Sequence, residues 1–303
     1  MTDELLSPLA VFPPSSDRRR DRYRPVFLPY LDQDSHEADP TERNDVTEII
    51  DLSISLANDI PADPPTMPVE IEYVTHDQGA GELADAFPGL NADQLPDGKG
   101  WALERVRIAT HNGTHMDAPW HYHPTMDGGV RATTIDEVPL DWCMRPGVRL
   151  DFREMPDGHV VTAGEIDAEL ARIDYDLQPL DIVLCATRAG ERFEQDDYVD
   201  AGCGFGRDAT LHLLRQGVRV VGTDGWSWDA PFSATRERFE ADGDPSIIWE
   251  GHKAGREIGY CQLEKLHALE RLPHTGFTVI CFPVKIAGAS AGWTRAVAVV
   301  DQQ

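Results

Sequence analysis

The sequence has little positive charge for its length. Lys and Arg number 27 among 303 residues, against 53 Asp and Glu, so the formal net charge is -26. A field of this sign repels polyanions, which argues against nucleic acid or an anionic membrane surface as a natural partner. The composition is nonetheless typical of a folded protein, because 41% of the residues are hydrophobic and only 26% are charged.

Several other features are missing. No run of about 18 apolar residues occurs, so no membrane span is expected. The amino terminus lacks the apolar core and cleavage site of a secretory signal. The five cysteines are an odd number with no CxxC pair, which predicts reduced thiols in the core. These absences indicate a cytoplasmic protein.

Two regions are expected along the chain. Residues 1–45 are rich in Pro, Asp and Arg and show no sustained apolar period, which predicts an extended amino-terminal arm. Residues 46–303 are expected to form the folded domain. A glycine-rich stretch, GCGFGRD at 202–208, does not meet the GxGxxG spacing and is interpreted as a turn that leads into a helix.

Hydrophobic periodicity predicts a mixed α/β domain with a partly barrel-like sheet and flanking helices. Residues 61–100 carry Pro, Gly and Asp at short intervals and are predicted to form a long loop with one short helix near 82–87. The predicted helices are 163–173 and 207–217, the second ended by Gly217. The predicted strands are 47–56, 101–110, 147–152, 181–187, 218–224 and 277–284.

Residues 109–124, ATHNGTHMDAPWHYHP, gather side chains that bind metals or move protons. Gly113 and Pro119 make a continuous helix unfavourable, so the cluster is not a helical His pair. A turn after a strand can instead direct two imidazoles and a carboxylate at one centre, as in open metal sites of hydrolases. The sequence therefore predicts a metal site, with His123, next to Pro124, as the weakest member of a cluster formed by His111, His115, Asp117, His121 and His123.

A second candidate element lies in residues 249–269, WEGHKAGREIGYCQLEKLHAL. It contains His252 and Glu264, separated by twelve positions. That spacing has no intrinsic meaning for metal binding, so from the residues alone a loop histidine and an exposed helical glutamate are the favoured interpretation.

The segment HNGTHMDAPWH follows the pattern His-x-Gly-Thr-His-x-Asp-x-Pro-x-His and resembles the cyclase superfamily, which includes bacterial kynurenine formamidases and isatin hydrolases. The resemblance extends from IIDLSISL near residue 49, through GVRVVGTDGWSWD at 217–229, to FPVKIAGASAGWTRAVAV near the carboxyl end. It covers about five sixths of the chain. The long segments 61–100 and before His252 look more like isatin hydrolase and its longer relatives than like the compact formamidases.

The resemblance implies specific roles. His111, His115 and Asp117 correspond to ligands of a first metal ion, and Asp117 can bridge to a second. His121 corresponds to the proton-transfer histidine, while His252 and Glu264 fall where dinuclear members hold the second ion. One or two ions, Mn²⁺ or Zn²⁺, are implied. So are a swivelling β/β/α type of fold and a homodimer or homotetramer.

The functional expectation is a hydrolase that opens a small cyclic amide, N-formyl amide or ester through activated water, with His121 as general acid and base. The substrate is expected to be aromatic, since tryptophans flank the matched motifs. Candidate substrate contacts are Trp101, Trp120, Trp226, Ser227 and Trp228, with Phe87, Asp229 and Phe232 as weaker ones. Two alternatives stay open: a polyketide-type cyclase or dehydratase of the same superfamily, and a non-catalytic protein that binds a metal or a small molecule.

Overall fold

The computed structural model describes residues 47–58 and 60–301. The predicted arm, residues 1–45, lies outside the described residues. The helices are α1 (His76–Ala86), α2 (Pro119–Tyr122), α3 (Ala163–Arg172), α4 (Arg207–Arg215), α5 (Phe232–Asp242) and α6 (Glu250–Ala254). The strands are β1 (Thr47–Asp51), β2 (Glu70–Val74), β3 (Leu103–Arg107), β4 (His115–Asp117), β5 (Thr125–Met126), β6 (Val130–Arg131), β7 (Met144–Asp151), β8 (Val160–Val161), β9 (Ile182–Ala186), β10 (Gly204–Phe205), β11 (Val220–Thr223), β12 (Cys261–Glu264), β13 (Phe277–Ile280), β14 (Ala291–Trp293) and β15 (Val297–Asp301).

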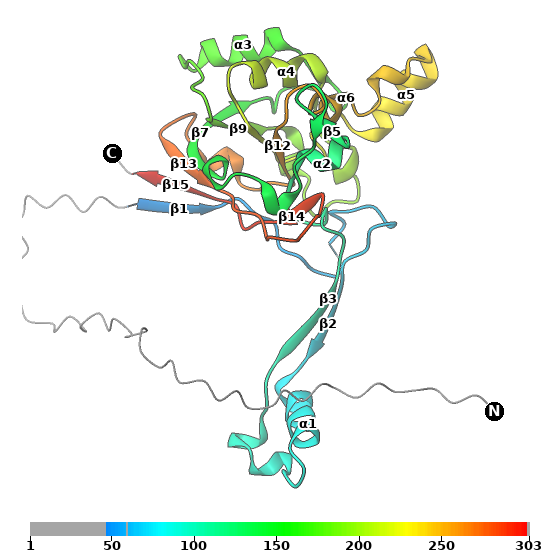
Figure 1. Ribbon diagram of the computed structural model, residues 1–303, viewed down its shortest axis with the longest axis vertical. Coiled ribbons are helices and arrows are strands. Elements are labelled where there is room, and N and C mark those ends of the chain that lie inside the picture. The colour runs from blue at the N-terminus through cyan, green and yellow to red at the C-terminus, as the bar shows by residue number, and fades with distance from the viewer. Residues whose placement is uncertain (1–46, 59, 302–303) are drawn as a thin grey trace, which may run out of the picture. The chain divides into compact units, whose positions relative to one another are not determined.

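One large sheet organises the described residues. Its nine strands run in the order β1-β15-β13-β7-β9-β11-β12-β4-β14. The central strands β7, β9, β11 and β12 are parallel to one another, whereas the remaining pairings toward both ends of the sheet are antiparallel. The sheet curls, and helices flank it (Figure 1). The prediction of a mixed α/β domain with a partly barrel-like sheet is confirmed.

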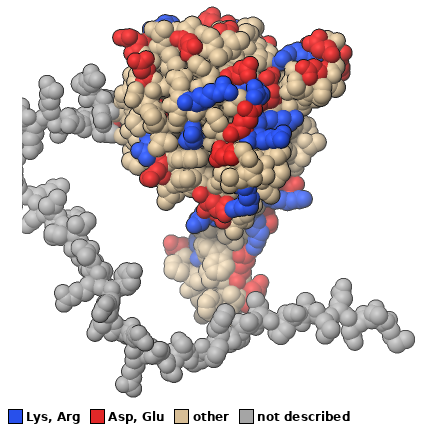
Figure 2. Space-filling model, turned by 45° about the horizontal axis from the view of Figure 1, so that its top comes forward, with Lys and Arg blue, Asp and Glu red and all other residues tan. Residues whose placement is uncertain are grey.

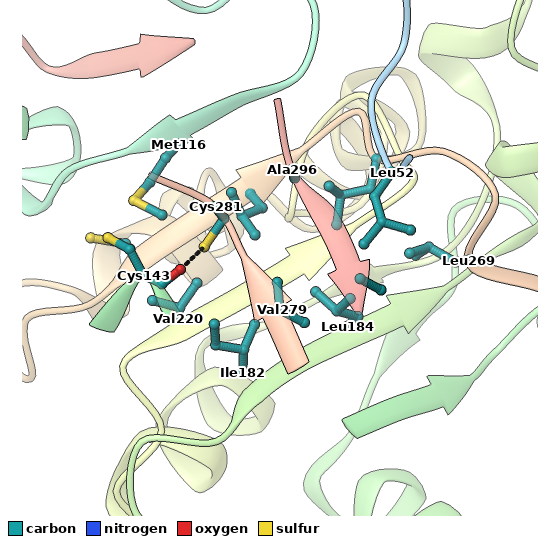
Figure 3. Packing of buried hydrophobic residues seen from close by; sticks show 14 of the residues in the cluster. Leu52, Met116, Cys143, Ile182, Leu184, Val220, Leu269, Val279, Cys281 and Ala296 are labelled. Atoms are coloured by element: carbon teal, nitrogen blue, oxygen red, sulfur yellow. Dashed lines mark hydrogen bonds between the residues drawn. The ribbon is translucent and has the colours of Figure 1, made fainter. Parts of the chain in front are cut away.

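Alternating side chains along the central strands fill two cores, one on each face of the sheet. In β9, Ile182 and Leu184 point into the first core and Val183 and Cys185 into the second, as expected for a strand buried on both faces. Figure 3 shows the first core, in which Leu184 lies near Val279 and Leu52. The second core receives α3 and α4, whose buried residues include Ile166 and Leu211.

Local signals explain the two helices that were predicted. At the start of α3, the Thr162 hydroxyl accepts a hydrogen bond from the backbone N–H of Glu165, and the Glu165 carboxylate accepts one from the backbone N–H of Thr162. This capping box satisfies two N–H groups that a helix start leaves free. After α4, Gly217 adopts a φ of +97°, which a residue with a side chain would adopt only at a cost.

Residues 61–100 differ from the predicted long loop. They contain β2 and the eleven-residue α1, and β2 pairs with β3 in a two-stranded hairpin. Every residue of β3 is exposed, and the hairpin extends away from the large sheet (Figure 1). The short alternating run EIEYV has too few apolar residues to stand out as a strand, which is why the sequence pattern missed it.

Acidic and basic side chains are interspersed on the face shown in Figure 2. All five cysteines are buried and free, as expected for core thiols. Among the described residues, no helix combines the length and apolar character that crossing a membrane requires.

Candidate metal centre

Strand β4 carries the centre of the site. All three of its residues, His115, Met116 and Asp117, are buried. Met116 points into the first core, so His115 and Asp117 face the opposite side of the sheet. On the neighbouring antiparallel strand β12, Glu264 lies directly across from His115. The strand register therefore brings Glu264 to the face that carries His115 and Asp117.

The two carboxylate oxygens of Asp117 face different imidazoles. Oδ1 lies 2.9 Å from His111 Nδ1 and 3.2 Å from His115 Nε2. Oδ2 lies 3.8 Å from Nε2 of His121 and 3.8 Å from Nε2 of His252. These residues form two groups with the spacing that metal binding requires, His111–His115–Asp117 and Asp117–His121–His252, and both groups share Asp117.

Glu264 joins both groups at its two oxygens. Oε2 lies 3.6 Å from His115 Nε2, and Oε1 lies 3.5 Å from His252 Nε2. Oε1 also accepts a hydrogen bond from the backbone N–H of Trp228 at 2.9 Å, which holds the carboxylate in place. All six predicted ligand and proton-transfer residues are thus brought together, although four of them lie within 111–121 and two lie far downstream.

Unpartnered polar atoms test whether a cation fits this cluster. Among the described residues, both oxygens of Asp117 and Nε2 of His115 are fully buried without a hydrogen-bond partner. Leaving such groups unpaired is costly, and a buried carboxylate is stabilised by coordination to a metal. Imidazole nitrogens and carboxylate oxygens are donors that Zn²⁺ and Mn²⁺ both accept. The donor set therefore fits a divalent ion.

Contacts at Nδ1 fix the ring orientation of His115 and His252. Nδ1 of His115 donates to the Gly113 carbonyl at 2.8 Å, and Nδ1 of His252 lies 2.5 Å from Asp229 Oδ2. Each contact assigns the proton to Nδ1 and leaves Nε2 free to act as a ligand, a pattern common among metal-binding histidines. Asp229, a weak substrate candidate in the sequence, instead orients His252 and also accepts from the backbone N–H of Gly251.

Burial and neighbouring charges shift the pKa values of His121 and His252. Burial lowers the pKa of His121 to about 4, so its imidazole is neutral at pH 7. For His252, burial lowers the pKa, but the attraction of Asp117 and Asp229 outweighs it and raises the pKa to about 10. The carboxylates thus favour a positive charge at His252 Nε2. A divalent cation bound at Nε2 of His252 would supply this positive charge in place of a proton.

A pocket of about 230 Å³ opens onto these side chains. Trp226 and Ser227, two of the predicted substrate contacts, line it together with the metal-site residues. The indole of Trp226 is held by its Nε1, which lies 3.4 Å from Asp63 Oδ1. An aromatic wall beside a polar cluster suits a small substrate with an apolar ring.

The other predicted tryptophans lie elsewhere. Trp228 is fully buried, stacks on Phe205 at 4.1 Å and donates to the Thr210 hydroxyl, so it belongs to the second core. Trp101 donates to Glu82 beside α1. Among the described residues, neither Trp101 nor the half-exposed Trp120 of α2 lines the pocket.

Two further predicted candidates also lie off the pocket wall. Phe87 is exposed at the end of α1. His123 closes a turn, since its Nδ1 accepts from the backbone N–H of Thr125 at 3.1 Å. Phe232, the other weak candidate, does line the pocket.

A buried ion pair beside the site was not predicted from the sequence. The ammonium of Lys265 donates to Asp63 Oδ1 at 2.5 Å and to the His111 carbonyl at 2.6 Å. Its side chain is 2% exposed. Lys265 therefore ties the turn that carries His111 to the segment around Asp63. The position of Lys265 directly after Glu264 was the one feature of the sequence that could have indicated its place beside the site.

Trp249 was also missed. Its ring stacks on His252 with centroids 4.5 Å apart and meets His121 edge-on at 5.0 Å. The sequence places it three residues before His252, but no periodicity distinguishes it from a core tryptophan. Its position covers two imidazoles of the site.

Comparison with known proteins defines the class to which this fold and site belong. A family model described as "Putative cyclase" matches residues 50–230, more than half of the chain. The chain belongs to this cyclase family, which confirms the resemblance seen in the sequence. The matched range includes His111, His115, Asp117 and His121, while His252 and Glu264 lie beyond it.

Individual relatives are enzymes. The chain is similar to the kynurenine formamidase of Salinibacter ruber, with 29% identity over 196 residues that cover 64% of this chain and 78% of that protein. It is also similar to the kynurenine formamidase of Maricaulis maris, with 30% identity over 195 residues, 64% of this chain and 79% of that protein. With the site described above, these likenesses identify the chain as a hydrolase of the cyclase family.

Solved structures share the fold. An isatin hydrolase bound to the product analogue thioisatinate matches with a TM-score of 0.66 and 21% identity, covering 84% of this chain and 93% of that one. Isatin hydrolase A from Labrenzia aggregata, bound to benzyl benzoate, matches with a TM-score of 0.63 and 21% identity over 84% of this chain and 94% of that one. The resemblance to the longer, isatin hydrolase-like members therefore holds for the fold.

Proposed function

We propose that this protein is a metal-dependent hydrolase that opens a small cyclic amide, an N-formyl amide or an ester, with an aromatic group in its substrate. The observation that carries the proposal is Asp117, whose two buried oxygens lie unpartnered among the described residues and face two different groups of imidazoles. The kynurenine formamidase relatives and the isatin hydrolase-like fold support an amide or lactam bond as the target.

His111, His115 and Asp117 would hold the first ion, and Asp117, His252 and Glu264 would hold a second where two are bound. When bound, a divalent cation such as Mn²⁺ or Zn²⁺ polarises a carbonyl and lowers the pKa of water. The protein's own contribution would be a fixed set of ligands, held by β4, β12 and the outer contacts of His115 and His252.

His121 would move the proton. Because burial lowers its pKa to about 4, its Nε2 is unprotonated at pH 7 and can accept a proton from the attacking water. The resulting imidazolium readily releases this proton to the leaving nitrogen or oxygen. His121 lines the pocket beside Trp226 and Ser227, which would orient the aromatic part of the substrate.

The test combines elemental analysis with a hydrolysis screen. We expect purified protein to contain Mn²⁺ or Zn²⁺ and to release a carboxylate from isatin, N-formylkynurenine or a related amide or ester. Chelation should abolish turnover, and added Mn²⁺ or Zn²⁺ should restore it. Full activity after exhaustive chelation, or inactivity of metal-loaded protein on the whole panel, would contradict the proposal.

We also propose that the protein assembles as a homodimer or homotetramer. The hairpin of β2 and β3 supports this, because an isolated two-stranded hairpin is marginally stable in water. It carries exposed apolar side chains, among them Tyr73, Leu103 and Val106. Light scattering of the wild type and of Leu103→Asp would test the assembly. A wild-type monomer would refute it.

A further inference from the structure

A second pocket lies beside the candidate metal centre, beneath α5. Its volume is about 220 Å³. One wall is α5, and the opposite wall comes from the residues just before α5 and just before α6. The lining is mainly apolar and consists of Asp229, Ala230, Phe232, Thr235, Arg236, Phe239, Ile248 and Trp249.

This pocket adjoins the pocket of the metal centre. Phe232 and Trp249 line both of them. The ring of Phe232 also meets that of Trp226 edge-on, with centroids 5.4 Å apart. A molecule bound against His121 and His252 would therefore have an aromatic boundary on this side, with apolar space beyond it.

The backbone conformation of Trp249 indicates that the structure holds its indole in a defined position between the two pockets. Trp249 adopts φ 61° and ψ 38°, the left-handed region, which costs a residue with a bulky side chain about 1 kcal/mol or more. Stacking on His252 offsets part of that cost. In this conformation Trp249 lines both pockets and so lies between them.

Helix α5 leaves apolar side chains for a ligand to cover. No residue of α5 is fully buried. Around the pocket, Phe232 is 51% exposed, Phe239 38% and Ile248 41%. Removing such surface from water stabilises a complex by about 25 cal/mol per Å². The family model ends at residue 230, so α5 and Ile248 belong to a part of the chain that it does not match.

We propose that the pocket beneath α5 is a subsite for an aryl or alkyl group attached to the bond that the enzyme hydrolyses. The proposal rests on the proposed function and adds the substrate class: an amide or ester with an apolar substituent longer than a formyl or acetyl group. The reacting carbonyl would lie at the metal centre, and the substituent would pass Trp249 to reach Phe239 and Ile248.

The test measures binding rather than turnover, so it is independent of the reaction. Calorimetry compares acetate, 3-phenylpropionate and 5-phenylpentanoate, both in metal-loaded and in metal-free protein. Each probe carries the same carboxylate and differs in its apolar part. The variants are Phe239→Ser and Ile248→Ser. Phe282→Ser is the matched control, because Phe282 is 44% exposed and lies on the wall of neither pocket.

In the wild type we expect 5-phenylpentanoate to bind at least about tenfold more tightly than acetate. Phe239→Ser and Ile248→Ser should each reduce that ratio severalfold, while Phe282→Ser keeps it. Equal affinities for all three probes, or a ratio unchanged in both pocket variants, would overturn the subsite. Absence of turnover with the length dependence intact would count against the proposed hydrolysis alone, because the subsite would still be present.

Discussion

Residues 111–121 and residues 252–264 supply candidate ligands to the same centre, but they reach it in different ways. The first stretch is local, since a turn, the short strand β4 and the short helix α2 present four side chains within eleven positions. The second depends on long-range structure: β12 places Glu264 opposite His115, and Asp229 orients His252. The near segment therefore supplies most of the candidate ligands by local structure, and the far segment adds His252 and Glu264 through long-range packing.

Asp117 belongs to both candidate metal-binding groups, so its replacement should have the largest effect. Asp117→Ala should lose all bound metal and all measurable turnover, because it removes the carboxylate that both groups share. His252→Ala is the matched variant in the far segment, and it should retain at least one ion through His111, His115 and Asp117. Elemental analysis of both proteins decides this. A metal-free His252→Ala protein would show that the near segment does not hold an ion by itself.

His121 separates metal binding from catalysis within the near segment. His121→Ala should keep the ion held by His111, His115 and Asp117, and should lose about 10²- to 10⁴-fold in kcat, the usual contribution of general acid and base catalysis. The reason is that His121 is neutral at pH 7 and available to accept a proton. Steady-state kinetics and metal analysis of the same variant test whether metal binding and catalysis separate in this way. A fully active variant would remove His121 from the mechanism.

Lys265 links the two segments, and its replacement should have an intermediate effect. Lys265→Met leaves the Asp63 carboxylate buried without its partner, which should cost about 3–5 kcal/mol in the free energy of unfolding. It also releases the His111 carbonyl, so metal affinity should fall by about tenfold, as for other groups that orient ligands.

A double variant distinguishes positioning from general stability. Asp63→Asn added to Lys265→Met removes the unpaired charge and should recover much of the unfolding free energy. Metal affinity should stay low, because His111 is still not held. Recovery of metal affinity along with stability would reduce Lys265 to a structural role. Denaturant unfolding and metal titration give the two readouts.

The same contrast explains what the sequence could predict. The near ligands were predictable because turn and strand keep them adjacent, and the repeated His and Asp types carry the chemistry. His252 and Glu264 entered only through the family resemblance, since twelve intervening residues say nothing about the register of β12 against β4. The strand at 181–187 was predictable from its continuous apolar run, and successive side chains of β9 fill the two cores because they point to opposite faces of the sheet.

Other features could not be derived from local patterns. Trp228 and Trp226 stand two positions apart, yet one stacks on Phe205 in the core and the other lines the pocket. The amino-acid sequence around them does not tell which indole is buried, because this depends on how the loop packs in the folded protein. The pairing of Lys265 with Asp63 joins residues about 200 positions apart, and no motif marks it.

We expect the smallest effect from the replacement of His123. This variant tests whether the metal site extends beyond His121. Its Nδ1 accepts from the backbone N–H of Thr125 and lies in neither metal-binding group. His123→Ala should therefore keep the metal content and change kcat less than twofold. The loss of one partly exposed hydrogen bond should lower the unfolding free energy by about 1 kcal/mol. Loss of metal in this variant would extend the site beyond His121 and would make the whole motif, rather than its first eleven residues, the metal-binding unit.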